Sequence, residues 1–393
     1  MSKNIVILCD GTSNEVSEDR TNILRLYGTL KKDSSQLVFY DPGVGTFGAA
    51  TSISYYFRRA TEIWGLATGW GIDQNVKEAY RFISEHYDDG KRNGKRVAEP
   101  DRIYIFGFSR GAYTARVLAG FLHTYGLVPK ENMNLLDYGY RAYKNIGSGN
   151  ENHNNSNDVF GEIKLFQRML QPLYPTISLL GLFDTVGSVI ESGRHGFRLR
   201  THAFTHTNRS VAHVRQALAI DEYRTMFNPQ LFPADNDHWP DHFQAKSAIP
   251  QDVKEVWFSG VHGDVGGGYP ETKSELAKIP LHWMIEETKP LGLKYITRTV
   301  NSVVLGKSKS NLYVAPNSSA RPNVSMNAGW KILEYLPRKY SRSDPNGNKG
   351  WFFPLSRRRT IPKGAYIHHS VFERRGKTTD YSQPNIPSEH TVV

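Results

Sequence analysis

Five short apolar runs limit what this chain of 393 residues can fold into. Each run is rich in β-branched or aromatic residues and is closely followed by glycine or aspartate. Near-continuous apolarity of this kind is typical of strands that are covered on both faces, as in a parallel sheet. The runs occupy residues 5–8, 37–40, 103–106, 177–183 and 256–258.

Helical patterns lie between these runs. Residues 73–86 place apolar side chains at helix spacing, and a second helical segment, residues 112–122, begins soon after the third run. Strand, helix and strand in alternation predict an α/β fold with a doubly wound, mostly parallel sheet. A hydrophobic fraction of 39% is enough to fill such a core.

Three later stretches depart from that rhythm. Residues 143–160 are rich in asparagine, glycine and serine, which is the composition of a mobile surface loop. Residues 191–250 surround one expected helix, residues 211–227; we expect a lid-like insert here, and an excursion without a role is the alternative. After residue 300, recurrent prolines predict irregular structure. The expected division is a main domain over residues 1–300 and a basic extension, residues 301–393, packed on it.

The most informative segment joins a strand, the pattern G-x-S-x-G and the start of a helix. The pattern is Gly107-Phe108-Ser109-Arg110-Gly111. A sharp turn from strand to helix forces unusual backbone angles on its central residue, and the flanking glycines remove Cβ atoms that would clash. Ser109 would then stand at the carboxyl end of the sheet as a nucleophile, and a plain structural turn is the alternative interpretation.

A serine hydroxyl becomes an effective nucleophile when a base takes its proton and an acid orients that base. In doubly wound hydrolases the order along the chain is serine, acid, histidine. The fourth run delivers Asp184 at its carboxyl end, and the fifth leads to His262 in a glycine-rich loop. We expect Asp184 to be the acid and His262 the base. Asp264 is the alternative acid, but its place in the same tight loop makes it a better candidate for bracing that loop.

The loop after the first run contains Asp10, Gly11 and Thr12. A backbone amide of Gly11 or Thr12 is expected to form an oxyanion hole with the amide of Arg110, which starts the helix after the nucleophile turn. A phosphatase with an aspartyl nucleophile would need a second aspartate two residues from Asp10, and Leu8 and Thr12 occupy those positions.

The formal net charge is +11, and much of the basic excess lies after residue 330. This charge fits a solvated basic face or peripheral docking on an anionic membrane better than nucleic-acid binding, so no nucleic-acid partner is expected. The single cysteine, Cys9, can form neither an internal disulfide nor a thiolate metal cluster. We expect no metal and no organic cofactor.

The sequence shows neither a membrane-spanning run nor the pattern of a signal peptide. No apolar run approaches the ~18–20 residues needed to cross a bilayer, and residues 1–4 lead straight into the first run. We expect cytoplasmic synthesis without a signal peptide. If this protein leaves the cell, we expect it to do so by a non-Sec route.

Six segments in this order resemble one known family. They are residues 9–14, 41–46, 107–112, 181–186, 217–222 and 260–269. Their sequences are similar to those of the DUF2235 family, an α/β-hydrolase-like group that includes the catalytic domain of type VI secretion phospholipase effectors of the Tle1 kind.

The resemblance implies an α/β-hydrolase-like catalytic domain over residues 1–300 and a serine ester hydrolase, a phospholipase or lipase. Its triad would fall on Ser109, Asp184 and His262. The substrate would be an ester or a phospholipid, and the partners would be a secretion-machinery component or an immunity protein. Two alternatives stay open: a catalytically silent binding module with the hydrolase fold, and an esterase for small non-lipid esters.

Overall fold

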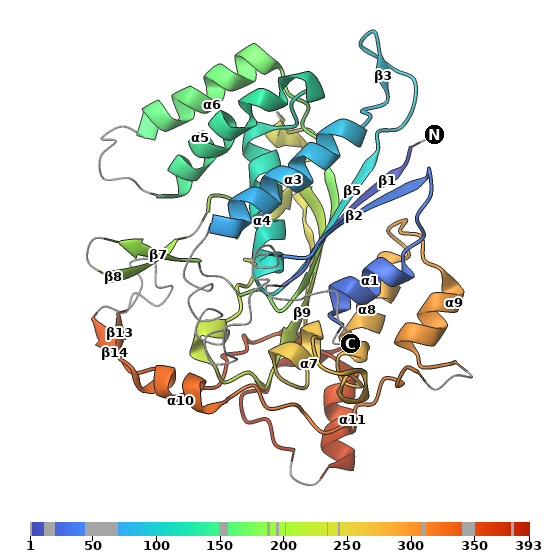
Figure 1. Ribbon diagram of the computed structural model, residues 1–393, viewed down its shortest axis with the longest axis vertical. Helices are drawn as coiled ribbons and strands as arrows, with labels where there is room; N and C mark the ends of the chain where they lie inside the picture. The colour runs from blue at the N-terminus through green and yellow to red at the C-terminus, as the bar shows by residue number, and fades with distance from the viewer. Residues whose placement is uncertain are drawn as a thin grey trace, which may run out of the picture.

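The computed structural model gives the arrangement of most of the chain (Figure 1). It describes residues 2–11, 20–43, 70–148, 156–186, 189–193, 196–200, 202–233, 235–242, 244–308, 312–339, 350–378 and 381–393. No helix within these ranges is both long and apolar enough to pass through a bilayer.

A parallel sheet forms the centre of the molecule. Within the described residues it contains eight strands in the order β16-β15-β12-β9-β6-β5-β1-β2, and every neighbouring pair is parallel. The order reverses between β1 and β5, so the carboxyl ends of the strands next to this point form the crevice in which such sheets bind ligands. The strands are β1 (Asn4–Cys9), β2 (Gln36–Asp41), β5 (Arg102–Phe108), β6 (Ile177–Phe183), β9 (Val211–Ala219), β12 (Asp252–Phe258), β15 (Ala365–Ile367) and β16 (His390–Val392).

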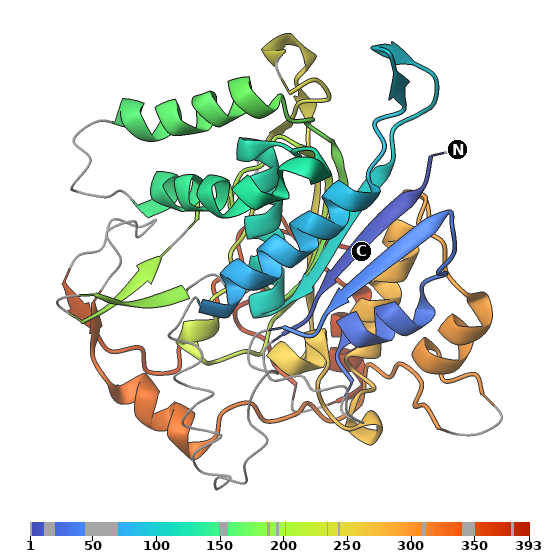
Figure 2. The ribbon, with the colours of Figure 1, turned by 45° about the horizontal axis from the view of Figure 1, so that its top comes forward.

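Helices cover both faces of the sheet (Figures 1 and 2). In β1, Ile5 and Ile7 join one core with α3 to α6, whereas Val6 and Leu8 join a second core with α1 and α8. This alternation confirms the predicted doubly wound α/β fold. The larger helices are α1 (Asn22–Thr29), α3 (Trp70–His86), α4 (Arg110–Tyr125), α5 (Leu136–Ser148), α6 (Ser156–Leu170), α8 (Lys278–Thr288), α10 (Ala328–Tyr335) and α11 (His369–Lys377).

Short elements fill the connections between these helices and strands. The short helices are η1 (Lys130–Leu135), η2 (Thr225–Phe227), η3 (Ala245–Ser247), α7 (His262–Gly266), η4 (Glu271–Lys273), α9 (Thr297–Thr299) and η5 (Val300–Val304). The paired short strands are β3 (Lys91–Arg92) with β4 (Lys95–Arg96), β7 (Val189–Gly193) with β8 (Gly196–Arg200), β10 (Asp237–His238) with β11 (Ile249–Pro250), and β13 (Arg338–Lys339) with β14 (Trp351–Phe352).

The helix expected over residues 211–227 is wrong. Strand β9 occupies residues 211–219 and pairs with β6 on one side and β12 on the other. Its alanine, leucine, glutamine and arginine residues favour helix locally, but pairing and burial between two strands override that propensity. The range 191–250 therefore includes a central strand of the sheet, and a lid role for the parts that flank it stays a prediction.

Two further stretches are more regular than expected. Helix α5 extends to Ser148 and α6 begins at Ser156, so the loop expected over residues 143–160 is wrong at both ends, while residues 149–155 lie outside the described part. In the C-terminal region, β15 pairs with β12, and β16 pairs with β15. The prediction of irregular structure after residue 300 is therefore wrong for these strands and for α11. The division of the chain near residue 300 stays a prediction.

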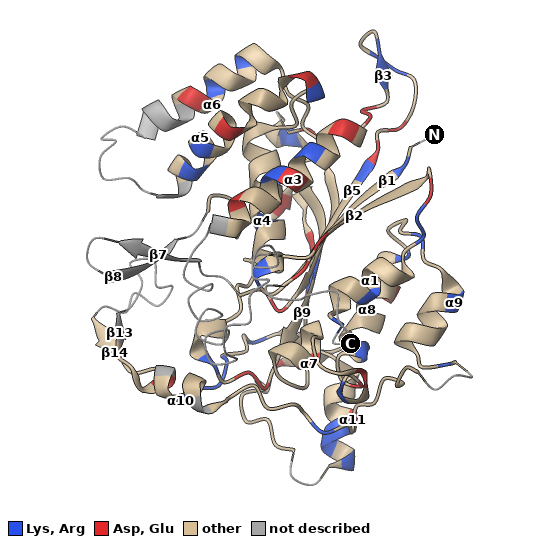
Figure 3. Ribbon diagram, viewed as in Figure 1, with Lys and Arg blue, Asp and Glu red and all other residues tan. Residues whose placement is uncertain are grey.

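The basic residues of the C-terminal region do not all face solvent. Figure 3 shows Lys and Arg spread over many elements, with a group on α11. Arg374 on α11 is buried and donates to the carbonyl oxygens of Ser318 and Ala320 at 2.9 and 2.5 Å. Arg359 is also buried. The interpretation of this region as a solvated basic face is therefore wrong for these two arginines.

Candidate active site

The turn between β5 and α4 holds Ser109 in a strained conformation. Ser109 has φ 57° and ψ −120°, a region that residues with a Cβ seldom adopt. A Cβ on Gly107 would lie 2.4 Å from the Gly111 carbonyl oxygen, and one on Gly111 would lie 2.2 Å from the Cys9 carbonyl oxygen. Both glycines are therefore needed because backbone approaches backbone here, as expected for a sharp strand-to-helix turn.

The structure brings together three side chains that are far apart in the sequence. His262 Nε2 lies 2.9 Å from Ser109 Oγ, and His262 Nδ1 lies 2.6 Å from Asp184 Oδ2. These residues follow β5, β6 and β12, whose parallel carboxyl ends lie at one edge of the sheet. The order of hydrogen bonds is hydroxyl, imidazole, carboxylate, which is the arrangement that proton transfer from a serine requires.

Two aromatic rings fix the plane of the imidazole. The centroid of Phe108 lies 4.8 Å from that of His262, and the centroid of Phe227 lies 4.9 Å away in an edge-to-face arrangement. Phe108 ends β5, while Phe227 belongs to η2 after β9. The ring is thus held by packing as well as by its two hydrogen bonds.

Arg359 binds the carboxylate of Asp184 from the C-terminal region. Its Nη1 donates to Asp184 Oδ1 at 2.6 Å and its Nη2 donates to Oδ2 at 2.9 Å, while both side chains are almost completely buried. The guanidinium also donates to the carbonyl oxygens of Ala219 and Phe227. The amide of Ala219 adds a further bond to Asp184 Oδ1 at 2.9 Å. Asp184 is therefore held at both oxygens, in the two-pronged geometry that favours arginine over lysine.

These contacts determine the protonation states of Asp184 and His262. Burial alone would raise the pKa of Asp184, but the charge of Arg359 and the hydrogen bonds from His262 and Arg359 hold that pKa well below its usual range. Burial lowers the pKa of His262 from its ordinary value of 6.5, and Asp184 opposes this shift only in part. At neutral pH the imidazole is therefore neutral, with Nδ1–H donating to the ionised Asp184 and Nε2 able to accept a proton.

Glu222 supports the loop that carries His262. Its Oε2 accepts the backbone amide of His262 at 3.1 Å, and its Oε1 accepts Arg224 Nε at 2.9 Å. Arg224 in turn lies over the ring of Phe227, 3.7 Å from its centroid. The sequence does not indicate this role, although Glu222 ends segment 217–222, one of the six segments that resemble the family.

Asp264 braces the same loop and does not hydrogen-bond the imidazole in any contact that the structure describes. Its Oδ2 accepts the amides of Val261 and Asn323, both at 3.1 Å, and its Oδ1 accepts Asn323 Nδ2 at 2.6 Å. This geometry agrees with the bracing interpretation of Asp264 and disfavours Asp264 as the alternative acid.

The expected oxyanion residues lie on two adjoining segments. Arg110 is the first residue of α4, and the close fit of Gly111 against Cys9 brings the first turn of α4 against the end of β1. The amide of Gly11 donates to Asp10 Oδ1 at 2.6 Å, so in this structure it has an acceptor. Thr12 lies outside the described residues. The oxyanion role of all three residues stays a prediction.

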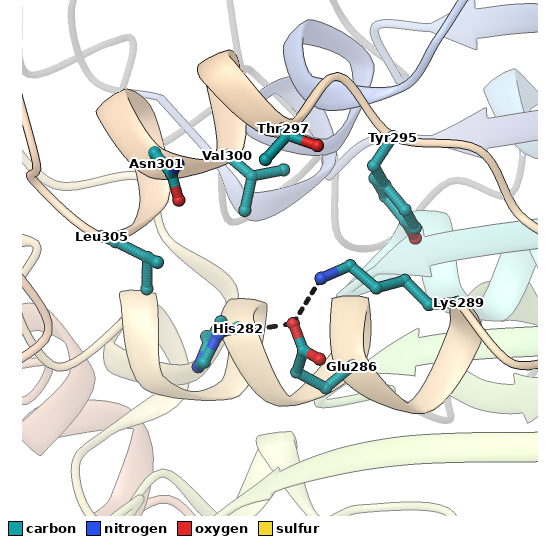
Figure 4. A pocket seen from close by; sticks show the side chains of 8 residues that line it. All are labelled: His282, Glu286, Lys289, Tyr295, Thr297, Val300, Asn301 and Leu305. Carbon is teal, nitrogen blue, oxygen red and sulfur yellow. Dashed lines mark hydrogen bonds and ion pairs between the residues drawn. The ribbon is translucent and has the colours of Figure 1, made fainter.

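Two hollows on the described surface lie away from these residues. One, of about 250 Å³, is lined by α8 and residues 295–305; in it Glu286 contacts His282 at 3.5 Å and Lys289 at 2.6 Å (Figure 4). The other, of about 310 Å³, lies near the amino ends of β5 and β6. Neither is lined by the proposed triad. Among the described residues, no group of three or more histidine, cysteine, aspartate or glutamate side chains is placed to hold a metal ion.

A family model identifies the group to which this geometry belongs. The model for the type VI secretion system phospholipase effector Tle1-like catalytic domain matches residues 3–287. The chain belongs to this family. YEL023C, an uncharacterized protein of Saccharomyces cerevisiae, is 33% identical to this Tle1-like chain over 244 residues, which cover 58% of the chain and 33% of that protein.

Solved structures are more distantly similar to the Tle1-like chain. An uncharacterized protein from Pseudomonas aeruginosa matches with 19% identity and a TM-score of 0.41, over 80% of this chain and 49% of that one. The Tle1 effector bound to the VgrG spike of the type VI secretion system matches with 19% identity and a TM-score of 0.30, over 70% of this chain and 52% of that one. The chain thus spans about half or less of the length of the proteins it matches.

Proposed function

We propose that this protein is a serine carboxylic-ester hydrolase of the phospholipase A kind, in which Ser109 is the nucleophile, His262 the general base and Asp184 the acid. The observation that carries the proposal is the continuous pair of hydrogen bonds, 2.9 and 2.6 Å, from Ser109 through the imidazole to Asp184. Membership in a family of phospholipase effector domains supports the same chemistry.

In the first half of the reaction, Ser109 Oγ attacks the ester carbonyl carbon while His262 Nε2 takes the hydroxyl proton. The tetrahedral intermediate then collapses, the bond to the leaving oxygen breaks, and the imidazolium gives its proton to that oxygen. The products of this half are an acyl ester of Ser109 and an alcohol, which for a glycerophospholipid is a lysophospholipid.

In the second half, water attacks the acyl ester while His262 Nε2 takes one of its protons. Collapse of the second intermediate releases the fatty acid and returns the proton to Ser109 Oγ. Asp184 stabilises the imidazolium in both halves, and Arg359 keeps Asp184 ionised for that task.

Negative charge on the carbonyl oxygen would be stabilised by backbone amides. The amide of Arg110 at the N-terminus of α4 is one donor in this proposal, because helix N-termini favour negative charge. The second donor is the amide of Gly11 or Thr12, and Gly11 would exchange its bond to Asp10 for one to the substrate.

Substitution of the nucleophile tests the proposal. Ser109→Ala is expected to lower hydrolysis of short p-nitrophenyl esters by about 10⁴-fold or more and to abolish labelling by a fluorophosphonate. Ser319→Ala, at an exposed serine, is the matched control and should behave as wild type. Unchanged turnover in the Ser109 variant would contradict the proposal, and a wild-type protein that resists the probe would favour the silent binding module.

The substrate class needs a separate experiment. Mass spectrometry of phospholipid vesicles after incubation should reveal a fatty acid and a lysophospholipid with wild type but not with Ser109→Ala. Hydrolysis of short esters without any lipid product would favour an esterase for small non-lipid esters.

The route of secretion is also a proposal. Membership in a type VI effector family supports export by a non-Sec route with a secretion-machinery partner. A tagged chain that reaches the medium only when the Sec pathway is active would contradict it.

A further inference from the structure

Helix α10 buries its acidic residue and exposes two of its apolar residues. Glu334 is completely buried, whereas Ile332 and Tyr335 are 65% and 68% exposed. A surface helix of a globular protein ordinarily turns its apolar stripe inward and its charged residues outward. Two apolar residues of α10, Ile332 and Tyr335, therefore face solvent while its acid faces inward.

Glu334 is buried because it fastens α10 to two neighbouring segments. Its carboxylate accepts the amide and hydroxyl of Thr225, and also the amide of Ser356 at 3.1 Å. The amide of Leu355 donates to the Glu334 carbonyl oxygen at 3.0 Å. These bonds hold α10 in one orientation, so the exposure of its outward apolar residues follows from a firmly attached helix.

The apolar surface continues beyond α10. Strands β13 and β14 pair Lys339 with Trp351, which returns the chain to the end of α10 (Figures 1 and 2). Six apolar side chains in this region, each between 50% and 71% exposed, are called the apolar platform here: Ile332, Tyr335, Leu336, Trp351, Phe353 and Leu355. Exposed apolar residues are ordinary when scattered, but these six stand on neighbouring segments and three of them are aromatic, which favours a contact surface.

Basic residues accompany the apolar platform. In residues 328–339 and 350–363 the sequence has seven lysine and arginine residues and a single acid, the buried Glu334. Arg359 is buried at Asp184, but Lys331, Arg357 and Arg358 are exposed. Apolar and aromatic side chains together with Lys and Arg are the combination that lies in the interface of anionic membranes.

The apolar platform is connected to the proposed active site. Trp330 of α10 contacts Phe227 edge-to-face with centroids 5.3 Å apart, and Phe227 packs in turn on the ring of His262. Arg224 lies over the rings of both Phe227 and Trp330. Trp330 thus joins α10 to the residues that hold the imidazole, while Ile332 and Tyr335 lie on the solvent side of the same helix.

We propose that the apolar platform and its basic neighbours dock the protein on the surface of an anionic lipid bilayer, which would hold α10, and with it the segment that packs on His262, at the lipid surface. This inference rests on the proposed function and deepens it by assigning the surface that meets the substrate. The charge selects the occupant: a second copy would bring the same basic residues face to face, whereas anionic headgroups neutralise them.

Vesicle binding tests the proposal in the Ser109→Ala background, where lipids stay intact. The protein is expected to co-sediment with phosphatidylcholine vesicles that contain phosphatidylglycerol, more weakly with phosphatidylcholine alone, and less at high salt. Ile332→Ser with Trp351→Ser should weaken binding at least about tenfold. Lys331→Gln with Arg357→Gln should weaken it by about 25-fold at low salt.

Matched controls use apolar residues on another part of the surface. Leu165 and Met169 on α6 are 57% and 65% exposed, and Leu165→Ser with Met169→Ser should leave vesicle binding unchanged. In the active background, the platform variants should keep wild-type turnover of a soluble short ester, which also shows that they fold, and should lose activity on vesicles in proportion to binding.

The outcomes separate this inference from the proposed function. A protein that binds anionic vesicles through the apolar platform but cleaves no ester would refute the function and keep the docking surface. Platform variants that bind vesicles as well as wild type overturn the inference. So does a dimer in light scattering that these substitutions dissociate while vesicle binding is unchanged.

Discussion

The bond between Arg359 and Asp184 makes the most specific prediction of this structure. Arg359→Gln removes a charge from a pair in which both side chains are at most 1% exposed, and it leaves the carbonyl oxygens of Ala219 and Phe227 without the guanidinium. Breaking a buried ion pair by removing one partner costs roughly 3–5 kcal/mol of unfolding free energy. For 393 residues, with an unfolding entropy of about 0.8 kcal/mol/K, the midpoint of thermal unfolding should fall by about 4–6 °C.

The loss of stability caused by Arg359→Gln should depend on pH. In wild type the pKa of Asp184 is lower in the folded than in the unfolded protein. Ionised Asp184 therefore adds to the free energy of unfolding above its ordinary pKa of 3.8, and this stabilisation is lost as the pH falls below that value. Without Arg359, burial would raise this pKa, and the ionised carboxylate would destabilise the fold as the pH rises. The difference between variant and wild type should therefore shrink from pH 8 towards pH 4.

Thermal unfolding followed by fluorescence across this range is the assay, and Arg357→Gln in the same arginine run is the control, because Arg357 is exposed. Turnover of a soluble ester should also fall in the Arg359 variant, by at most the roughly 10⁴-fold expected when the acid itself is exchanged. If both variants unfold at the same temperature as wild type at pH 8, the reasoning on Arg359 is refuted.

Three further predictions concern the site and its turn. Asp184→Asn should lower kcat by about 10⁴-fold, whereas Asp264→Asn should mainly lower thermal stability; a reversed order in ester assays would reassign the acid. Because burial lowers the pKa of His262, the acid limb of a kcat/KM profile should have its midpoint below pH 6.5, and a midpoint above that value would contradict the assigned environment. Gly111→Ala should yield little folded protein, because its Cβ would lie 2.2 Å from the Cys9 carbonyl oxygen. A variant purified at wild-type yield with a wild-type circular dichroism spectrum would contradict this.

Local sequence patterns were sufficient to predict much of this fold. The five predicted runs lie within β1, β2, β5, β6 and β12, because a short continuous apolar run is recognisable without knowledge of its partners in the sheet. The strand-end positions of Ser109, Asp184 and His262 could be predicted for the same reason, since each lies within a few residues of such a run.

Long-range pairing explains what the sequence could not reveal. Strand β9 consists largely of good helix formers and is a strand because β6 and β12 lie on either side of it. Strands β15 and β16 are three residues each, too short for a pattern to show. Arg359 stands in a run of three arginines that looks like surface charge, and nothing in its neighbours indicates which of the three is buried.

The separation of Asp184 and Arg359 by 175 residues also affects when a newly made molecule can act. A ribosome that has finished Ser109, Asp184 and His262 has not yet added the guanidinium, nor the last two strands of the sheet. Until residue 359 emerges, the carboxylate has no cation to offset its burial, and it would take up a proton instead of orienting the imidazole. In the proposed enzyme, ester cleavage would therefore require residue 359 in place as well as Ser109, Asp184 and His262.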